Sequence, residues 1–427
     1  MKRDDAYLLE VAAPAADAAP SEAARDGSAR PAPPSLDGRM MRRLMNALGD
    51  PPLRVTLWNG ESIHTGAAPA VATVRIGDRA TLLKLCINPE LHLGDAYRDG
   101  AVEIEGDMVK LFEAAFRGLA RPSFLSWTRR LDKWFNRPRA NTLPDARENI
   151  HHHYDLGNEF YRLWLDRDML YTCAYFPAAD ATLEQAQAAK MEQICRKLGL
   201  RQGECVVEAG CGWGALALYM ATHHGVRVRA FNISREQIAW ARARARAAGA
   251  EGLVEFIEDD YRNISGRYDA FVSVGMLEHV GVDHYNELGA IIDRSLGADG
   301  RGFLHSIGQI QPTPFNAWIE KRIFPGAYPP ALGEMLTILD GGKFSVLDVE
   351  NLRQHYALTI DHWLRRFENA REQISAMYDE RFARAWRFYL AGSQAAFNTG
   401  NLQLFQVLFA RGSGCNVPWT RAFLYAS

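Results

Sequence analysis

The segment Cys205–Met220, which reads CVVEAGCGWGALALYM, constrains the fold more than any other part of the chain. An apolar run, Cys205–Val207, leads to Glu208, and three glycines follow at alternate positions, Gly210, Gly212 and Gly214. Glycine lets the backbone turn sharply and lets a ligand approach without a Cβ in the way. The apolar residues after the last glycine predict a helix, whose first N–H groups are unpaired. The segment therefore predicts a strand, a tight turn and a helix.

The spacing of these glycines and the acidic residue before them indicate a ligand without phosphate. G-x-G-x-G differs from the G-x-G-x-x-G of dinucleotide sites, and the carboxylate of Glu208 would repel a pyrophosphate. S-adenosylmethionine (SAM) carries a sulfonium, an ammonium and ribose hydroxyls, and no phosphate. We therefore expect SAM at this turn. The alternative is a glycine-rich turn of any α/β protein.

Strand-like and helical runs alternate around this turn. Such alternation is typical of a parallel sheet with helices on both faces, in which ligands bind beyond the carboxyl ends of the strands. Polar segments follow the expected strands, and Ser234 and Gln237 have capping-box spacing for a helix that runs to Gly249. We expect a helix at Glu184–Leu198 and further strands at Val226–Phe231, Val254–Ile257, Ala270–Val274 and Gly302–His305.

The rest of the chain divides into an extension, a small domain, a linker and a C-terminal part. Residues 1–36 are rich in Ala and Pro and are expected to be disordered. The basic, aromatic residues 121–149 fit either an anionic membrane surface or a solvated linker. Residues 37–120 predict a small α/β domain with strands Leu53–Trp58, Ala72–Ile76 and Val102–Ile104, a turn at Gly94–Tyr97, and helices Met40–Leu48 and Met108–Phe116.

Residues 150–427 are expected to form the catalytic domain, and its last part is rich in aromatic residues. These aromatics could cap an apolar pocket or form ordinary core. We expect helices in this part at Val349–Tyr356, Thr359–Glu380, Phe382–Ala396 and Leu402–Phe409.

Composition excludes several classes of protein. The formal net charge of −2 gives no case for nucleic-acid binding. The six cysteines form no C-x-x-C and no zinc spacing, which fits a reducing cytoplasm. The consecutive histidines His151–His153 would point in different directions on a helix, so we expect no metal site. Acidic residues near the N-terminus disrupt any signal-peptide core, and we expect a cytoplasmic protein that could touch a membrane peripherally.

Six motifs together resemble the cyclopropane fatty acid synthase family of SAM-dependent methyltransferases. The likeness runs from about Leu53 to Phe409. It implies a class I SAM-dependent methyltransferase fold, Rossmann-like with a mostly parallel sheet, preceded by a small α/β lipid-handling domain. The motifs are HYDLGNEFY from His153, YTCAYF from Tyr171, EAGCGWG, LEHVG, HSIG and WIEKRIFPG.

That family adds a methyl carbon across a cis double bond of a phospholipid acyl chain, with a bound bicarbonate as base. The resemblance implies that bicarbonate is held by the side chains of Glu278, His305 and Tyr356 and by the backbone of Cys173 and Ile307. It implies that SAM is bound by Tyr171, Thr172, Glu208, Gly210, Cys211, Gly212, Asn232, Gln237, Asp260 and Tyr261.

The resemblance also implies a homodimer at the inner face of the membrane, acting on a phospholipid surface with unsaturated acyl chains. Three residues depart from the family pattern: Glu208 replaces Asp, Asn232 stands where Thr is common, and Phe176 where Trp is common. Relatives that add a methyl or methylene branch to the same alkene are the main alternative. A lipid-binding protein on an inactive scaffold and a small-molecule methyltransferase are two others.

Overall fold

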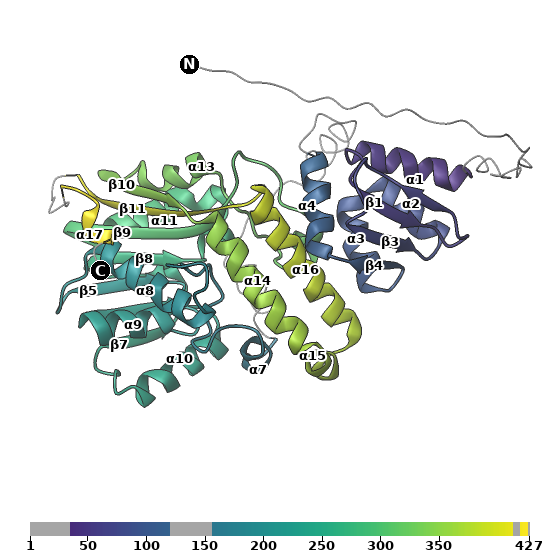
Figure 1. The fold of residues 1–427 in the computed structure, drawn as a ribbon. Coiled ribbons are helices and arrows are strands. Elements are labelled where there is room, and N and C mark those ends of the chain that lie inside the picture. Colours follow the sequence, from purple (N-terminus) through teal and green to yellow (C-terminus); the bar gives the residue numbers. More distant parts are fainter. Residues whose placement is uncertain (1–34, 120–155, 413–418, 426–427) are drawn as a thin grey trace, which may run out of the picture. The chain divides into compact units, whose positions relative to one another are not determined.

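The computed structural model describes residues 35–119, 156–412 and 419–425 (Figure 1). The predicted extension up to residue 34, the basic linker and His151–His153 lie outside the described residues. The elements below belong to the unit Leu36–Ser427. The domain boundaries stated above remain predictions.

A seven-stranded sheet in the order β10-β11-β9-β8-β5-β6-β7 forms the framework of the larger part. The five strands from β5 to β9 are parallel, and β11 runs antiparallel to both of its neighbours. Chain order reverses at β5, and ligands of open α/β sheets bind at such a switch point. The strands are β5 (Cys205–Ala209), β6 (Arg227–Asn232), β7 (Val254–Glu258), β8 (Tyr268–Val274), β9 (Leu296–Gly308), β10 (Phe344–Asn351) and β11 (Gln403–Arg411).

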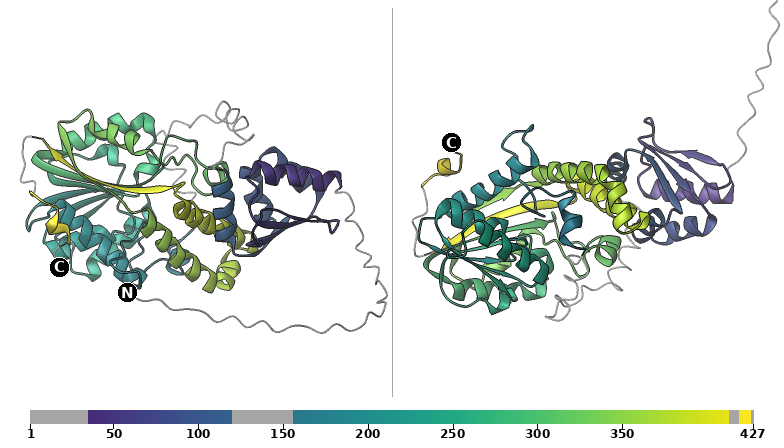
Figure 2. Two further views of the ribbon diagram at one scale, coloured as in Figure 1. Left: turned by 45° about the horizontal axis from the view of Figure 1, so that its top comes forward. Right: turned by 90° about the horizontal axis from the view of Figure 1, so that it is seen from below.

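Helices cover both faces of this sheet, as predicted (Figure 1, Figure 2). Successive strand residues point to opposite faces; thus Val206 joins the core under α8, α9 and α10, and Val207 joins the core under α11 and α13. The helices are α8 (Leu183–Leu198), α9 (Ala215–His224), α10 (Arg235–Ala247), α11 (Tyr285–Ser295) and α13 (Leu332–Leu336). Short turns of 3-10 helix lie between them at η1 (Tyr261–Asn263), η2 (Leu277–His279), η3 (Val282–His284) and η4 (Thr337–Leu339).

Two of the helices predicted near the C-terminus are wrong. All of Leu402–Phe409 except Leu402 lies in strand β11, and the first part of Val349–Tyr356 lies in β10. Residues 403–410 of β11 are all buried, so the strand lacks the alternation of a half-exposed one, and a short apolar run of this kind cannot be told from a buried helix by periodicity. The helix predicted at Thr359–Glu380 is divided into α14 (Arg353–Asn369) and α15 (Arg371–Met377), and Phe382–Ala396 is confirmed within α16 (Glu380–Thr399).

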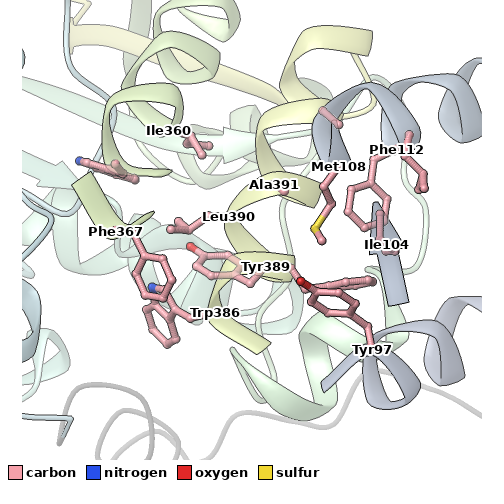
Figure 3. Packing of buried hydrophobic residues seen from close by; sticks show 14 of the residues in the cluster. Tyr97, Ile104, Met108, Phe112, Ile360, Phe367, Trp386, Tyr389, Leu390 and Ala391 are labelled. Carbon is pink, nitrogen blue, oxygen red and sulfur yellow. The ribbon is translucent and has the colours of Figure 1, made fainter. Parts of the chain in front are cut away.

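Helix α16 has two buried sides. Trp386 packs edge-on against Phe160 of α7 (Asn158–Arg162), with ring centroids 5.0 Å apart, and Phe388 packs on Phe112, at 4.9 Å. Figure 3 shows Leu390 of α16 near Ile360 of α14, and Phe112 and Met108 on the other side of α16. The helix therefore joins the aromatic core of the larger part to the N-terminal elements.

The N-terminal elements form a four-stranded sheet, β2-β1-β3-β4, in which β1 and β3 are parallel and the other pairs antiparallel. The predicted strands and helices are confirmed, but the turn predicted at Gly94–Tyr97 is wrong, because those residues continue α3. The elements are β1 (Leu53–Thr56), β2 (Ser62–His64), β3 (Ala72–Ile76), β4 (Val102–Gly106), α1 (Leu36–Ala47), α2 (Arg79–Ile87), α3 (Pro89–Arg98) and α4 (Met108–Leu119).

In the part of the chain that the structure describes, no helix has the length and apolar character needed to cross a bilayer. The remaining short helices are α12 (Ala317–Arg322) and α17 (Ala422–Tyr425).

Helix α3 lies against α12 because Gly94 leaves room for the indole of Trp318. Trp318 is buried, and its Nε1 donates to Asp95 at 3.1 Å. A Cβ at Gly94 would overlap the indole ring.

We predict that Gly94→Ala lowers the free energy of unfolding by about 1–3 kcal/mol, because overpacking a filled core forces its neighbours apart. Gly333→Ala in α13 is the matched control, since a Cβ there meets no atom within 4 Å. Urea denaturation of both variants measures the difference. Equal unfolding midpoints for the two variants would contradict this packing.

Candidate functional site

The glycine turn after β5 has the backbone conformation that its sequence predicts. Gly210, Gly212 and Gly214 have φ of +85°, +52° and +81°, in the left-handed region that favours glycine. A side chain at Gly214 would overlap Phe256. The N–H groups of Gly210 and Cys211 donate to the carbonyl of Phe231, at 2.9 and 3.1 Å, which fixes the turn to the end of β6.

A pocket opens at this turn, beyond the carboxyl ends of β5, β6, β7 and β8. The structure brings all ten predicted SAM-binding residues to its wall. They are Tyr171, Thr172, Glu208, Gly210, Cys211, Gly212, Asn232, Gln237, Asp260 and Tyr261. Met276 and His279, from the loop after β8, line the pocket as well.

Asn232 connects three parts of the pocket wall. Its Nδ2 donates to the Gly212 carbonyl at 3.2 Å and to Oε1 of Gln237 at 2.7 Å, and its Oδ1 accepts from the N–H of Ser234 at 3.2 Å. Ser234 caps α10 by accepting from the Gln237 N–H, so half of the predicted capping box forms. The other half does not, because the Gln237 side chain bonds Asn232.

A buried acid and a buried lysine share the inner wall of the pocket. Glu208 and Lys190 are each almost fully buried, and Lys190 Nζ donates to Oγ1 of Thr172 at 2.7 Å. Burial raises the pKa of Glu208 and lowers the pKa of Lys190, while the attraction between the two charges opposes both shifts. Glu208 Oε2 is buried and has no hydrogen-bond partner among the described residues. A ligand with an ammonium or hydroxyl group would supply one.

Sequence reasoning did not single out Lys190. A signal was present, because Lys190 falls between Ala186 and Ile194 at the four-residue spacing of the apolar face of α8. A lysine at such a position must be buried or reach past the core.

Glu278 lies in η2, directly after β8, and its carboxylate is anchored to β9. Its Oε1 accepts from the N–H of Ile307 at 2.6 Å. The predicted donor Ile307 is therefore used by the protein itself. Oε2 of Glu278 is buried and has no partner among the described residues. Burial raises the pKa of Glu278 to about 7.

His305 lies two residues before Ile307 on β9, so both side chains belong to the same face of the sheet. Its Nδ1 lies 3.2 Å from Nε2 of Gln406, and its Nε2 is buried and has no partner among the described residues. Burial, together with the positive charges of Lys190 and Lys197, holds the pKa of His305 well below its ordinary value. His305 is therefore neutral at pH 7.

The two remaining predicted residues meet at the start of α14: Tyr356 lies in its first turn, and Cys173, from the segment before α8, contacts the residue that precedes it. Cys173 Sγ is 3.9 Å from the carbonyl of Leu352, and the Tyr356 N–H donates to that same carbonyl at 3.0 Å. Burial raises the pKa of the Cys173 thiol, which keeps its proton. The ring of Tyr356 is buried against Phe397, with centroids 4.5 Å apart.

Hydrogen bonds connect this pair to Glu278 through the sheet. The N–H of Leu352 donates to the Leu404 carbonyl at 2.9 Å, and Leu404 is the β11 partner of Ile307, which bonds Glu278. The five predicted catalytic residues therefore belong to one continuous set of bonded segments. None of them is among the residues that line the SAM-side pocket.

Burial of Glu278 predicts a pH-dependent effect of Glu278→Gln on stability. The pKa in the folded protein, about 7, exceeds the ordinary value of 4.5. The folded state therefore disfavours the charge, and stability falls as pH rises from 4.5 through 7. Glutamine cannot ionise and can still accept from Ile307. We expect the variant to be more stable than the wild type by about 2–3 kcal/mol at pH 8.5, with the gain shrinking toward pH 5.

Urea denaturation at both pH values tests this expectation. Glu251→Gln, at an exposed turn, is the control and should show no such trend. A Glu278→Gln variant that gains nothing at pH 8.5 would refute the buried-charge interpretation.

The chain is similar to known proteins over most of its length. Residues 142–407 match the family described as mycolic acid cyclopropane synthetase, and residues 40–126 match a domain of unknown function. A probable fatty acid methyltransferase from Pseudomonas putida is 36% identical over 88% of this chain and 96% of its own length. The cyclopropane-fatty-acyl-phospholipid synthase of Escherichia coli K12 is 36% identical over 81% of this chain and 89% of its own length.

A solved structure is similar over the larger part of the chain. The crystal structure of the mycolic acid cyclopropane synthase CmaA1, complexed with SAH and CTAB, gives a TM-score of 0.59 at 29% identity. It covers 62% of this chain and 98% of its own. The predicted class I methyltransferase fold and SAM-dependent methyl transfer are thereby confirmed, and the chain belongs to the mycolic acid cyclopropane synthetase family.

Proposed function

We propose that this enzyme transfers the methyl carbon of SAM to a cis double bond of a phospholipid acyl chain and closes a cyclopropane ring. The observation that carries the proposal is the pair of buried atoms Glu278 Oε2 and His305 Nε2, which have no partner among the described residues. The name of the Escherichia coli relative supports the same reaction.

An alkene is a weak nucleophile, so the protein must hold it in line with the methyl–sulfur bond of SAM. The C–S bond breaks as a C–C bond forms, which leaves a carbocation on the acyl chain. Water would capture that cation, so the acyl site must be dry. Tyr171, which lines the pocket, is packed against the buried rings of Tyr161, Trp164 and Trp363 at centroid distances of 5.1–5.6 Å, so the surroundings of the SAM site are apolar on this side.

Ring closure needs a base that removes a proton from the transferred methyl group. His305 is a poor base because its pKa lies well below the ordinary value, and the Cys173 thiol keeps its proton. The unpartnered atoms fit bicarbonate instead. An ionised Glu278 can accept from an O–H group, and an imidazole N–H can donate to a carboxylate oxygen. Bicarbonate bound there would supply the base.

The carbon atom from which the proton leaves decides the product. Loss of a proton from the new methyl group closes the ring, and the products are the cyclopropane, S-adenosylhomocysteine and a proton. Other fates of the cation give a methyl- or methylene-branched chain, which is the alternative activity. The proposal for ring closure rests on two buried atoms, Glu278 Oε2 and His305 Nε2, that have no partner among the described residues.

We also propose that the enzyme acts at the surface of a phospholipid bilayer with unsaturated chains, and that it contacts the inner face of the membrane peripherally. It would act as a homodimer, and its N-terminal α/β elements would handle the lipid. The support for this proposal is chemical, because the acyl substrate lies in a bilayer. Activity on vesicles that exceeds activity on dispersed free fatty acid would support this part, and the reverse preference would count against it.

We predict that the enzyme, given methyl-labelled SAM and vesicles of a cis-monounsaturated phospholipid, produces acyl chains with upfield cyclopropane proton signals and loses vinyl signal. Removing dissolved bicarbonate should lower the rate, and adding it back should restore the rate. Labelled chains without ring signals would identify a branching methyltransferase. If the rate does not change with the bicarbonate concentration, bicarbonate takes no part in the mechanism, and Glu278 would be the base.

For SAM binding, we predict that Gly212→Ala raises Kd about tenfold, a loss of about 1.4 kcal/mol. A Cβ at Gly212 meets no protein atom within 4 Å, so the methyl group would enter the pocket. Gly249→Ala is the matched control. The φ of Gly249 is +64°, so an alanine there is similarly strained, and its Cβ would also meet no atom within 4 Å. Gly249 follows α10 and does not line the pocket. Calorimetry with SAM decides, and equal Kd values in the two variants would contradict this placement.

A further inference from the structure

A row of buried polar side chains connects His305 to two carboxylates on β10. Gln406 is the cross-strand partner of both His305 and Glu350. Its Nε2 lies 3.2 Å from His305 Nδ1, and its Oε1 accepts from Nζ of Lys197 at 2.8 Å. Lys197 also contacts Glu350 at 2.6 Å and Asp348 at 3.1 Å. Gln406 is fully buried and the Lys197 side chain is 1% exposed, so solvent can replace neither.

The orientation of the Gln406 amide follows from these contacts. The ammonium of Lys197 can only donate, so it must face the amide oxygen. A reversed amide would place its own donors against the ammonium. The NH₂ group therefore faces His305, and it also lies 3.4 Å from Oε1 of Gln193.

A donor on one side of an imidazole fixes where the ring carries its proton. His305 is neutral, and its Nδ1 receives the Gln406 donor, so Nδ1 must be the unprotonated nitrogen. The proton then resides on Nε2, the buried atom that has no partner among the described residues.

We infer that Lys197 and Gln406 are positioning residues that hold His305 in its Nε2–H tautomer and so create a hydrogen-bond donor for the anion site. The value of this donor to bicarbonate rests on the function proposed above. The tautomer itself does not. A purely structural role, in which these residues only join α8 to β10 and β11, would leave the tautomer free to vary.

The test is ¹⁵N NMR of the full chain labelled at histidine, with the His305 signals assigned by their loss in His305→Gln. The wild type should show a protonated Nε2 and an unprotonated Nδ1. In Gln406→Glu a carboxylate oxygen faces the ring and can only accept, so Nδ1 should become protonated. Gln403→Glu is the matched control, a buried amide on the same strand that bonds Asn351 and Gly400, and should keep the wild-type pattern.

A proton on Nδ1 in the wild type, or an unprotonated Nδ1 in Gln406→Glu, would overturn the inference. Gln406→Met provides a second variant of similar volume. It removes the donor, so the ring should populate both tautomers. Lys197→Met should act in the same direction, and its effect should not add to that of Gln406→Met, because both act through one amide.

The link to bicarbonate has its own readout. In Gln406→Met the KM for bicarbonate should rise about twofold, because only the molecules in the Nε2–H tautomer can donate to the anion, with a smaller change in kcat at saturation. An unchanged KM would separate the tautomer from anion binding and overturn that part of the inference. If the wild-type rate does not change with bicarbonate, bicarbonate has no part in the proposed function, and the ¹⁵N pattern still decides the tautomer.

Discussion

The anchoring of Glu278 holds the candidate site together. Its carboxylate accepts from the Ile307 N–H on β9 at 2.6 Å, and its own carbonyl accepts from the N–H of Tyr328 at 2.8 Å. One residue thereby ties the loop after β8 to the neighbouring strand and to the segment after α12. The second oxygen, Oε2, has no partner among the described residues. Because burying an unpaired carboxylate oxygen costs free energy, a ligand that donates a hydrogen bond to Oε2 would be stabilised there.

The SAM-side pocket and the buried groups of Glu278 and His305 lie at the ends of neighbouring strands of the sheet. Beyond β5 to β8, a pocket offers backbone groups of the glycine turn, the Asn232 network and the buried acid Glu208 to a cationic ligand. Near the end of β9, Glu278 Oε2 and His305 Nε2 are buried atoms with no partner among the described residues. The bicarbonate proposed above would thus be held by elements other than those of the SAM pocket, and the chain of bonds through Leu352 and Leu404 links β9 to α14.

The sequence was sufficient for the parallel core and for the SAM-side pocket, because both depend on local signals: apolar runs that end in polar segments, and glycines at fixed spacing. It was not sufficient for β11, whose residues 403–410 are all buried and whose partners are distant in the chain. It also missed Lys190, Lys197 and Gln406. Their roles arise from packing α8 on the sheet, and a lysine in a helix carries no local mark of burial apart from its place on the apolar face. The resemblance implies that the Ile307 backbone binds bicarbonate, but only the structure shows that its N–H already donates to Glu278.

The most direct test of the central claim is whether the site beside Glu278 binds bicarbonate. Titration of ¹³C-labelled bicarbonate into the protein with S-adenosylhomocysteine present, followed by ¹³C NMR, measures this without turnover. The structure predicts a bound resonance that saturates in the wild type and disappears in Glu278→Gln. No bound resonance in the wild type, or one that persists unchanged in Glu278→Gln, would contradict the claim.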